Sequence, residues 1–199
     1  MTTRSPAVER VCEAALAHFA ITGYDGASLN EIASMIGIKK ASLYSHFAGK
    51  DALYLQVLAD AVAVESAFAD DALSGPAPAE GPGAHYVQSI ADRYDASVHL
   101  RYLLRTVFLP PVQHKEVIGH AYEGFLELLR DGFLQQLQSS VPEAISQEQR
   151  TRYGIAFVGI VESLFVELVY AGRETMTARR DALWQVLLDS LQLRTSAAA

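Results

Sequence analysis

Three of the four lysines in this chain fall within twelve residues, at Lys39, Lys40 and Lys50. Polar and aromatic side chains that can donate hydrogen bonds lie between them: Ser42, Tyr44, Ser45 and His46. Lysine and hydroxyl groups bind phosphate oxygens, and the same groups can reach base edges in the major groove of DNA. The chemistry that this segment offers is therefore binding to a nucleic acid.

The distribution of charge supports this interpretation, although the net charge of −7 argues against it at first sight. Residues 1–55 carry five bases and five acids, so the entire net charge lies after residue 55. The N-terminal part of the chain therefore repels a polyanion far less than the remainder does.

Helices must position these side chains. Apolar residues recur at spacings of three and four, and no segment alternates convincingly with period two, so we predict an all-α fold. The first helix is expected to begin after Ser5 as N-cap and to end at Gly23, which can adopt a left-handed conformation. Ser28 and Glu31 have the spacing of a capping box, which predicts a second helix as far as about Met35.

The next residues predict a helix-turn-helix. Gly37 permits a sharp turn, Ile38 enters the small core, and a third helix is expected from Lys40 to Phe47. In a helix-turn-helix the start of the second helix enters the major groove, while neighbouring helix ends contact phosphates. Lysine at a helix N-terminus is unfavourable by about 0.3–1 kcal/mol, and a nearby polyanion would turn that cost into attraction. A longer helix is expected from Lys50 or Asp51.

The remainder of the chain is also predicted to be helical. The segment from Ser74 to Gly83 is rich in proline and glycine and predicts a flexible loop. Further helices are expected over the ranges 84–107, 115–139, 146–172 and 175–194. A break is expected at Pro110 and Pro111, and the tail from Thr195 is expected to fray.

Residues 10–54 resemble the DNA-binding domain of the TetR/AcrR family of transcriptional regulators. The matching residues are Arg10, Ala14, Ala15, Phe19, Gly23, Tyr24, Ser28, Ile32, Ala33, Gly37, the run Leu43-Tyr44-Ser45-His46-Phe47, Lys50 and Leu53. The match covers about a quarter of the chain. One residue departs from the pattern, because Lys39 stands where the family often has a capping serine or threonine.

The resemblance implies a protein of two domains. Residues 1–50 would form a three-helix DNA-binding domain with a helix-turn-helix, and residues 51–199 a larger helical bundle for ligand binding and dimerisation. The function implied is that of a homodimeric regulator, most often a repressor. It would bind double-stranded DNA at a palindromic operator and be released by a small hydrophobic or aromatic effector.

Chemistry and this resemblance together assign the DNA contacts. Lys40 and Ser42 are expected at base edges or phosphates, and Ala41 at a thymine methyl group. Tyr44 and His46 suit phosphates or bases. The full predicted set is Ser28, Lys39, Lys40, Ala41, Ser42, Tyr44, Ser45, His46 and Lys50. The residues predicted to form the small core instead are Ile32, Ala33, Ile38, Leu43 and Phe47.

The segment from Tyr153 to Ala171 is apolar on nearly every side. Glu162 and Glu167 in its centre argue against a membrane span, because each would be costly in lipid. Such a helix is instead buried by a core and a partner together. The predicted dimer interface consists of Gly159, Ser163, Leu183, Leu187 and Leu191.

An effector cavity is predicted among the aromatic residues of the other helices. A charged group that faces an aromatic interior needs a partner, so we expect Arg105 to pair with Glu162. The residues predicted to line the cavity are Tyr94, Tyr102, Arg105, Phe108, Phe125, Phe157, Glu162 and Phe165.

Other classes fit less well. The single cysteine, Cys12, excludes a disulfide scaffold or a thiolate zinc site, and His114 with His120 supplies too few metal ligands. No histidine follows a glutamate at the spacing of a di-iron bundle, and Gly49-Lys50 lacks the rest of a phosphate loop. We predict no catalytic residue, metal site or cofactor, although a Ser-His-Asp enzyme stays open.

The alternative function is an all-α small-molecule-binding or scaffold protein without operator binding. The first residues show no apolar run followed by a cleavage site, so we expect a cytoplasmic protein.

Overall fold

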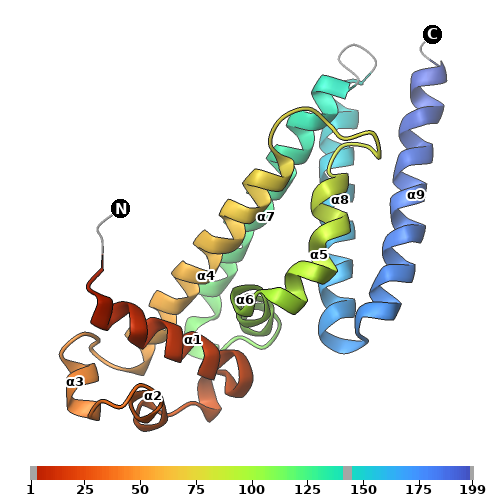
Figure 1. The fold of residues 1–199 in the computed structure, drawn as a ribbon. Helices are drawn as coiled ribbons and strands as arrows, with labels where there is room; N and C mark the ends of the chain where they lie inside the picture. The colour runs from red at the N-terminus through yellow and green to blue at the C-terminus, as the bar shows by residue number, and fades with distance from the viewer. Residues whose placement is uncertain (1–3, 141–144, 198–199) are drawn as a thin grey trace. The chain divides into compact units, whose positions relative to one another are not determined.

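The computed structural model describes residues 4–140 and 145–197, which form helices and loops with no strand among them (Figure 1). The predicted all-α fold, with an N-terminal helix-turn-helix followed by a larger helical part, is confirmed. The elements are α1 (Pro6–Gly26), α2 (Leu29–Met35), α3 (Lys40–Tyr44), α4 (Lys50–Leu73), α5 (Ala84–Ala96), α6 (Val98–Phe108), η1 (Val112–His114), α7 (Lys115–Ser140), α8 (Gln147–Tyr170) and α9 (Arg173–Ala197).

The chain folds as two compact units. The first unit contains the described residues up to Glu65 together with Ser97–Tyr122. The second contains Ser66–Ala96 together with the described residues from Glu123 onward. Helices α4 and α7 cross these bounds, so each contributes residues to both units. The domain boundary predicted after residue 50 stays a prediction.

Local signals in the first unit act largely as predicted. Ser5 caps α1, and its Oγ accepts a hydrogen bond from Val8 N at 3.4 Å. Gly23 interrupts the helical conformation near the end of α1, with φ 71° and ψ −176°. This region of backbone space is essentially restricted to glycine. The Arg105 guanidinium of α6 would also lie 3.1 Å from a Cβ at Gly23, a tight contact that would make Arg105 shift.

The turn between α2 and α3 is a Schellman motif. Gly37 adopts φ 71°, Ile38 N donates to Ala33 O at 3.0 Å, and Gly37 N donates to Ser34 O at 3.2 Å. The sharp turn predicted at Gly37 is therefore confirmed. The same motif fixes the direction in which the chain enters α3.

Two details of the predicted helix-turn-helix are wrong. Ser28 caps α2 by accepting from Asn30 N at 3.2 Å, but Glu31 forms no capping box with it and pairs with His18 Nε2 at 3.1 Å. Helix α3 ends at Tyr44 rather than Phe47. The Ser45 hydroxyl donates to Ser42 O at 2.6 Å and occupies the carbonyl that the next helical turn needs, so the chain tightens there.

Tyr54 of α4 is the centre of the core of the first unit. Its ring packs edge-on against Phe19 of α1 and Tyr102 of α6, with centroid distances of 5.0 and 5.6 Å. Its hydroxyl lies 3.0 Å from Thr106 Oγ1, and the Tyr102 hydroxyl donates to the Tyr54 carbonyl at 3.0 Å. Helices α1, α4 and α6 are thus joined by aromatic packing whose polar atoms are satisfied.

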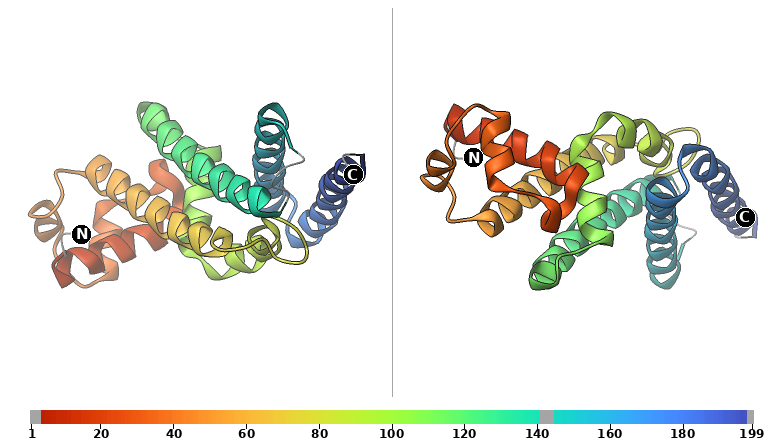
Figure 2. Two further views of the ribbon diagram at one scale, coloured as in Figure 1. Left: turned by 90° about the horizontal axis from the view of Figure 1, so that it is seen from above. Right: turned by 90° about the horizontal axis from the view of Figure 1, so that it is seen from below.

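In the second unit α8 and α9 lie side by side, joined by a turn at Gly172 (Figures 1 and 2). Ser146 and Gln149 form a capping box at the start of α8. The prediction of two long helices here is confirmed, although α9 continues to Ala197 instead of ending at 194. Of the tail expected to fray, Ala198 and Ala199 lie outside the described residues.

The connections between helices were predicted in part. The loop from Ser74 to Gly83 is confirmed, and the buried Gln136 side chain holds both of its ends. Its Oε1 accepts from Gly83 N at 2.8 Å, and its Nε2 donates to Leu73 O at 3.0 Å.

The single helix predicted over 84–107 is wrong. Ser97 divides it by capping α6, where its Oγ accepts from Leu100 N at 3.2 Å.

Two of the described helices, α4 and α8, are long and apolar enough to cross a membrane by length and composition. In the most apolar stretch of 18 residues, 39% of the residues are buried in α4 and 50% in α8. Core helices of folded domains share this length and composition, so the two helices are weak evidence for a membrane span.

Replacement of Gly23 tests the constraint at the end of α1. Gly23→Ala should reduce the free energy of unfolding by about 1–3 kcal/mol, because alanine rarely adopts this backbone conformation. Urea unfolding followed by circular dichroism measures the change. Gly26→Ala is the matched control, since a Cβ there meets Thr22 Cβ at an ordinary 3.4 Å. Equal stability of the two variants would contradict this account of Gly23.

Candidate nucleic-acid interface

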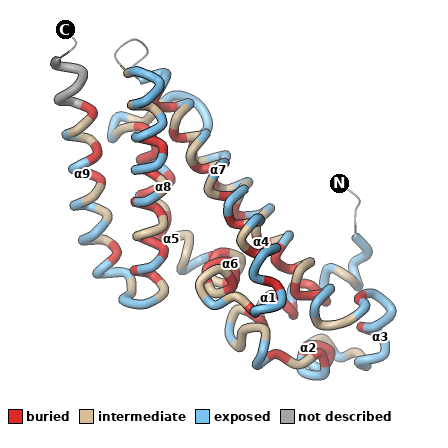
Figure 3. Tube along the Cα trace, turned by 180° about the vertical axis from the view of Figure 1, so that it is seen from behind, coloured by how far each residue is buried: buried red, intermediate tan, exposed pale blue. Residues whose placement is uncertain are grey.

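Helix α3 is largely exposed, whereas α2 beside it contains buried residues (Figure 3). Leu43 and Phe47 are buried, as predicted, together with Ile32 and Ala33 of α2. Ile38 is half-buried. The residues of this segment predicted to contact DNA are all exposed: Lys39, Lys40, Ala41, Ser42, Tyr44, Ser45 and His46. Seven of the nine predicted residues are thus exposed on α3 and at its two ends.

The exposed side chains make few contacts of their own. Lys39 is the N-cap of α3 and makes no side-chain capping hydrogen bond, as its departure from the family pattern predicts. Lys40 Nζ lies 5.8 Å from the centre of the Tyr44 ring, and Tyr44 is 50% exposed. An ammonium group beside a half-exposed phenol offers a charge and a hydrogen-bond donor to the same phosphate.

Arg10 helps to position α3 by binding the turn before it, a role that the sequence analysis did not assign. Its Nη2 donates to Ile36 O at 3.1 Å and so ties α1 to the turn that precedes α3. The one signal in the sequence was the place of Arg10 among the residues that match the family. The His18–Glu31 pair adds a second link between α1 and α2.

Lys50 lies at the start of α4 and is half-buried. Its Nζ donates to Tyr24 O at 2.9 Å and to Ala27 O at 3.3 Å, and lies 4.2 Å from the centre of the Tyr24 ring. A cation is favourable near these carbonyls because they end α1. Lys50 therefore fixes the end of α1 to the start of α4, and its predicted contact with DNA stays a prediction.

Asp51 completes this junction. Its carboxylate accepts hydrogen bonds from the Tyr24 hydroxyl and from His114 Nε2, the latter at 2.8 Å. The hydrogen bond from Tyr24, followed by that from His114, lowers the pKa of Asp51. Burial and the hydrogen bond to Asp51 raise the pKa of Tyr24. Sequence analysis missed this cluster because Asp51 and His114 lie 63 positions apart.

The residues predicted to line an effector cavity fall in both units. Tyr102 is buried in the first unit, where Arg105 lies against Gly23 and Phe108 is half-buried. In the second unit Phe125, Phe157 and Phe165 are buried, and Tyr94 is half-buried. The predicted cavity and its Arg105–Glu162 pair stay predictions.

Glu162 itself lines a groove of about 390 Å³ between α7 and α8, opposite Glu123 and Glu127. Burial raises the pKa of Glu162. Among residues 4–140 and 145–197, no group of three or more His, Cys, Asp or Glu side chains could hold a metal ion.

The predicted dimer residues differ in exposure. Gly159 is exposed, with open space where a Cβ would stand, and Ser163 accepts a hydrogen bond from Arg179 at 3.1 Å. Leu183 is half-buried, whereas Leu187 and Leu191 are buried within the single chain. Apolar residues that the prediction did not include are more exposed on the same two helices: Ile155 at 64%, Val166 at 38% and Val186 at 67%.

Comparison with known proteins identifies the N-terminal part of the chain. Residues 11–57 match the family model of bacterial regulatory proteins of the tetR family, so the predicted resemblance is confirmed. Over 48 residues the chain is 44% identical to the biofilm operon icaADBC HTH-type negative transcriptional regulator IcaR of Staphylococcus aureus. The corresponding regulator of Staphylococcus epidermidis is 39% identical over 46 residues. The S. aureus match covers 24% of this chain and 26% of the regulator, so the chain matches about a quarter of the length of its curated relative.

Solved structures resemble nearly the whole chain. A TetR-family regulator from Mesorhizobium loti has a TM-score of 0.71 and 20% identity, with 94% of this chain and 98% of that chain covered. The regulator FadR from Bacillus subtilis, solved with stearoyl-CoA, has a TM-score of 0.65 and 15% identity, with 90% and 97% covered. At these identities the comparison shows a shared fold. The proteins matched are named as regulators rather than enzymes, in agreement with the sequence analysis.

The acid dependence of stability tests the Asp51 cluster. A carboxylate whose pKa is lower in the folded state stabilises the fold above its unfolded pKa of about 3.9, and this contribution is lost as the pH falls through the folded pKa. Asp51→Asn should therefore be less stable than the wild type at neutral pH, and the difference should shrink below about pH 4. Urea titrations across this range measure it, with Asp25→Asn as an exposed control. A pH-independent difference would contradict the assignment.

Proposed function

We propose that this chain is a DNA-binding transcriptional regulator, most simply a repressor. The observation that carries the proposal is the exposed polar face of α3, held on buried Leu43 and Phe47. In a helix-turn-helix this face enters the major groove. The match of residues 11–57 supports the same function, and the matched staphylococcal relative is named a negative regulator.

The proposed DNA site is a two-fold symmetric operator bound by a homodimer. A symmetric dimer presents two recognition helices to half-sites one or more helical turns apart. Support for dimerisation comes from α8 and α9, which expose the apolar side chains of Ile155, Val166 and Val186. Gly159 of α8 is also exposed, with open space where a Cβ would stand. Exposed apolar surface of this kind is characteristic of protein interfaces.

The proposed signal is a small hydrophobic or aromatic effector that releases the protein from DNA. The aromatic side chains of the predicted cavity support an apolar ligand, and FadR, which has the same fold, was solved with stearoyl-CoA. Release requires that the effector bind one conformation more tightly than the other. A coupling of about 1–3 kcal/mol would lower operator affinity roughly 5- to 150-fold.

The competing function is a small-molecule-binding or scaffold protein of the same fold that does not bind an operator. The two functions differ in one observable, the enrichment of a palindromic sequence from a random DNA pool.

As a DNA-binding regulator the protein would act without catalysis, in the cytoplasm, where its DNA is accessible.

Variants of α3 test the DNA contacts. Selection from a random pool should give a palindromic consensus, and Lys40→Ala or Tyr44→Ala should weaken binding to it by about 1–3 kcal/mol per protomer. Fluorescence anisotropy at physiological salt measures the affinity. Lys115→Ala is the matched control, because Lys115 is an exposed lysine of the same unit that lies outside the helix-turn-helix. Wild-type affinity in both α3 variants would exclude the proposed face.

Lys50 needs a separate readout, because its ammonium already binds two carbonyls. Lys50→Ala should lower thermal stability as well as DNA affinity, whereas Tyr44→Ala should lower affinity alone. A Lys50 variant of unchanged stability would contradict its structural role.

Charged substitutions test the proposed dimer. Val186→Arg should yield a folded monomer, because it places a charge in an apolar contact without disturbing the buried side of α9. Leu187→Arg is less informative, since Leu187 is buried in the single chain and its loss would unfold the protein. Val112→Arg, at a residue 90% exposed in the first unit, is the control. Light scattering measures the mass, and a dimeric Val186→Arg variant would place the interface elsewhere.

A further inference from the structure

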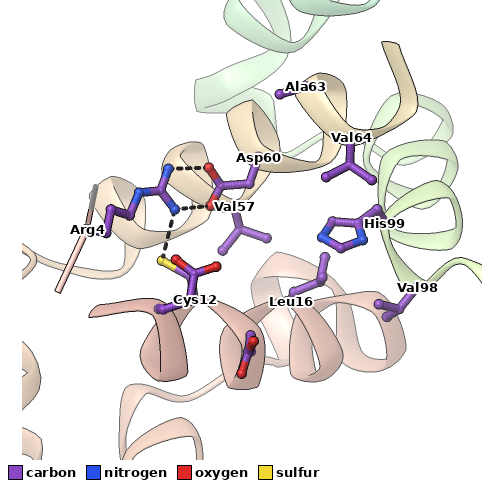
Figure 4. A pocket seen from close by; sticks show the side chains of 11 residues that line it. Arg4, Cys12, Leu16, Val57, Asp60, Ala63, Val64, Val98 and His99 are labelled. Carbon is purple, nitrogen blue, oxygen red and sulfur yellow. Dashed lines mark hydrogen bonds and ion pairs between the residues drawn. The ribbon is translucent and has the colours of Figure 1, made fainter. Parts of the chain in front are cut away.

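The first unit contains a cavity of about 610 Å³ between α1, α4 and the start of α6 (Figure 4). Its floor consists of Cys12, Leu16 and Val57, each at most 5% exposed. Val64 of α4 and Val98 of α6 extend this apolar surface. Volume and lining both fall within the range of sites that bind small organic molecules.

The rim of the cavity is charged, and its charges are unequal. The Arg4 guanidinium binds both carboxylate oxygens of Asp60, so these two charges neutralise each other. Glu9 and Glu13, one turn apart on α1, also line the cavity and are exposed. In the part of the chain that the structure describes, neither glutamate takes part in an ion pair. His99 also lines the cavity. With histidine counted as neutral, the lining carries one positive charge, on Arg4, and three negative charges, on Glu9, Glu13 and Asp60, which is a net charge of −2.

Glu9 lies in the first turn of α1, where the helix dipole favours an acid. Glu13 lies beyond the first turn and gains nothing from the dipole. Both carboxylates repel an anionic ligand and attract a cationic one.

We propose that this cavity binds a small organic cation with an apolar body, such as an aromatic quaternary ammonium compound. The apolar part would lie on Cys12, Leu16 and Val57, and the cationic group between Glu9 and Glu13. This site is distinct from the effector cavity predicted among the aromatic residues, and its existence does not depend on the proposed function.

An occupant of this cavity would contact the two helices that position α3. Helix α1 carries Arg10, which holds the turn before α3, and α4 begins with Lys50, which holds the end of α1. A ligand between α1 and α4 would therefore bias the orientation of the recognition surface. This consequence rests on the proposed function, whereas binding itself is measured without DNA.

The rate at which Cys12 is alkylated reports whether the cavity is occupied. Cys12 is the single cysteine of the chain and lies in the cavity floor, where Arg4 Nη1 approaches its Sγ at 3.8 Å. Burial raises the pKa of Cys12 to about 11, so the thiol is protonated at neutral pH. Its alkylation is therefore slow and depends on access through the cavity.

The test uses the full chain and three probes of similar size: benzyltrimethylammonium, benzyl alcohol and benzoate. Calorimetry gives their affinities, and the rate of iodoacetamide labelling reports protection of Cys12. The cation should bind and protect Cys12, benzyl alcohol should bind about 3- to 10-fold more weakly, and benzoate should not bind. The double variant Glu9→Gln/Glu13→Gln should bring the cation to the affinity of the alcohol, whereas Glu116→Gln, an exposed control, should change nothing.

A filling substitution tests the location. Ala63 is exposed at the mouth of the cavity, so Ala63→Trp should abolish protection of Cys12 by the cation without disturbing the core. Ala59→Trp is the matched control, an exposed alanine of the same helix that does not line the cavity. Equal affinity for the three probes, or protection that survives Ala63→Trp, would overturn the proposal. Neither result would bear on operator binding, which is measured separately by anisotropy with and without the cation.

Discussion

The position of the exposed face of α3 depends on one packing arrangement, the contact of Tyr54 with its neighbours. Through this ring α4 is fixed to Phe19 of α1 and Tyr102 of α6, and the Tyr54 carbonyl and hydroxyl both find partners. Edge-on aromatic pairs contribute about 0.5–1.5 kcal/mol each beyond the area that they bury. A side chain at this position must therefore be both aromatic and able to form a hydrogen bond, because its hydroxyl is the partner of the Thr106 hydroxyl in the same core, and an unsatisfied hydroxyl there would be costly.

Helix α3 needs support from the rest of the first unit because it is short. A helix of five residues is far below the length at which a peptide helix is stable in water, so tertiary contacts must supply its conformation. Leu43 and Phe47 supply the apolar part of that support. Arg10 and Lys50 supply the polar part, by binding the carbonyls of the turn before α3 and of the end of α1. A scaffold held in this way leaves the outer face of α3 free to vary without loss of the fold.

The sequence predicts those features whose cause is local. The cap at Ser5, the positive φ at Gly23 and the turn at Gly37 each depend on residues within one helical turn, although α1 continues to Gly26 instead of ending at Gly23. The break at Ser97 was missed because a serine within a helical pattern has two interpretations. It can remain in the helix, or it can cap a new one, and here its hydroxyl also donates to buried Glu65 at 2.7 Å. That contact lies 32 positions away, beyond the reach of a local rule.

The same limit explains why exposure was easier to predict on α3 than on α8 and α9. On α3 a polar residue faces water and an apolar residue faces the core, so residue type decides orientation. On α9 the core and a partner would both select leucine and valine, and residue type decides nothing. Burial within the single chain distinguishes core residues from residues available to a partner. Leu187 is buried, whereas Val186, the preceding residue of the helix, is exposed. Apolar residues on a helix are therefore evidence of a partner only where the structure shows that they are not buried in the core of the chain itself.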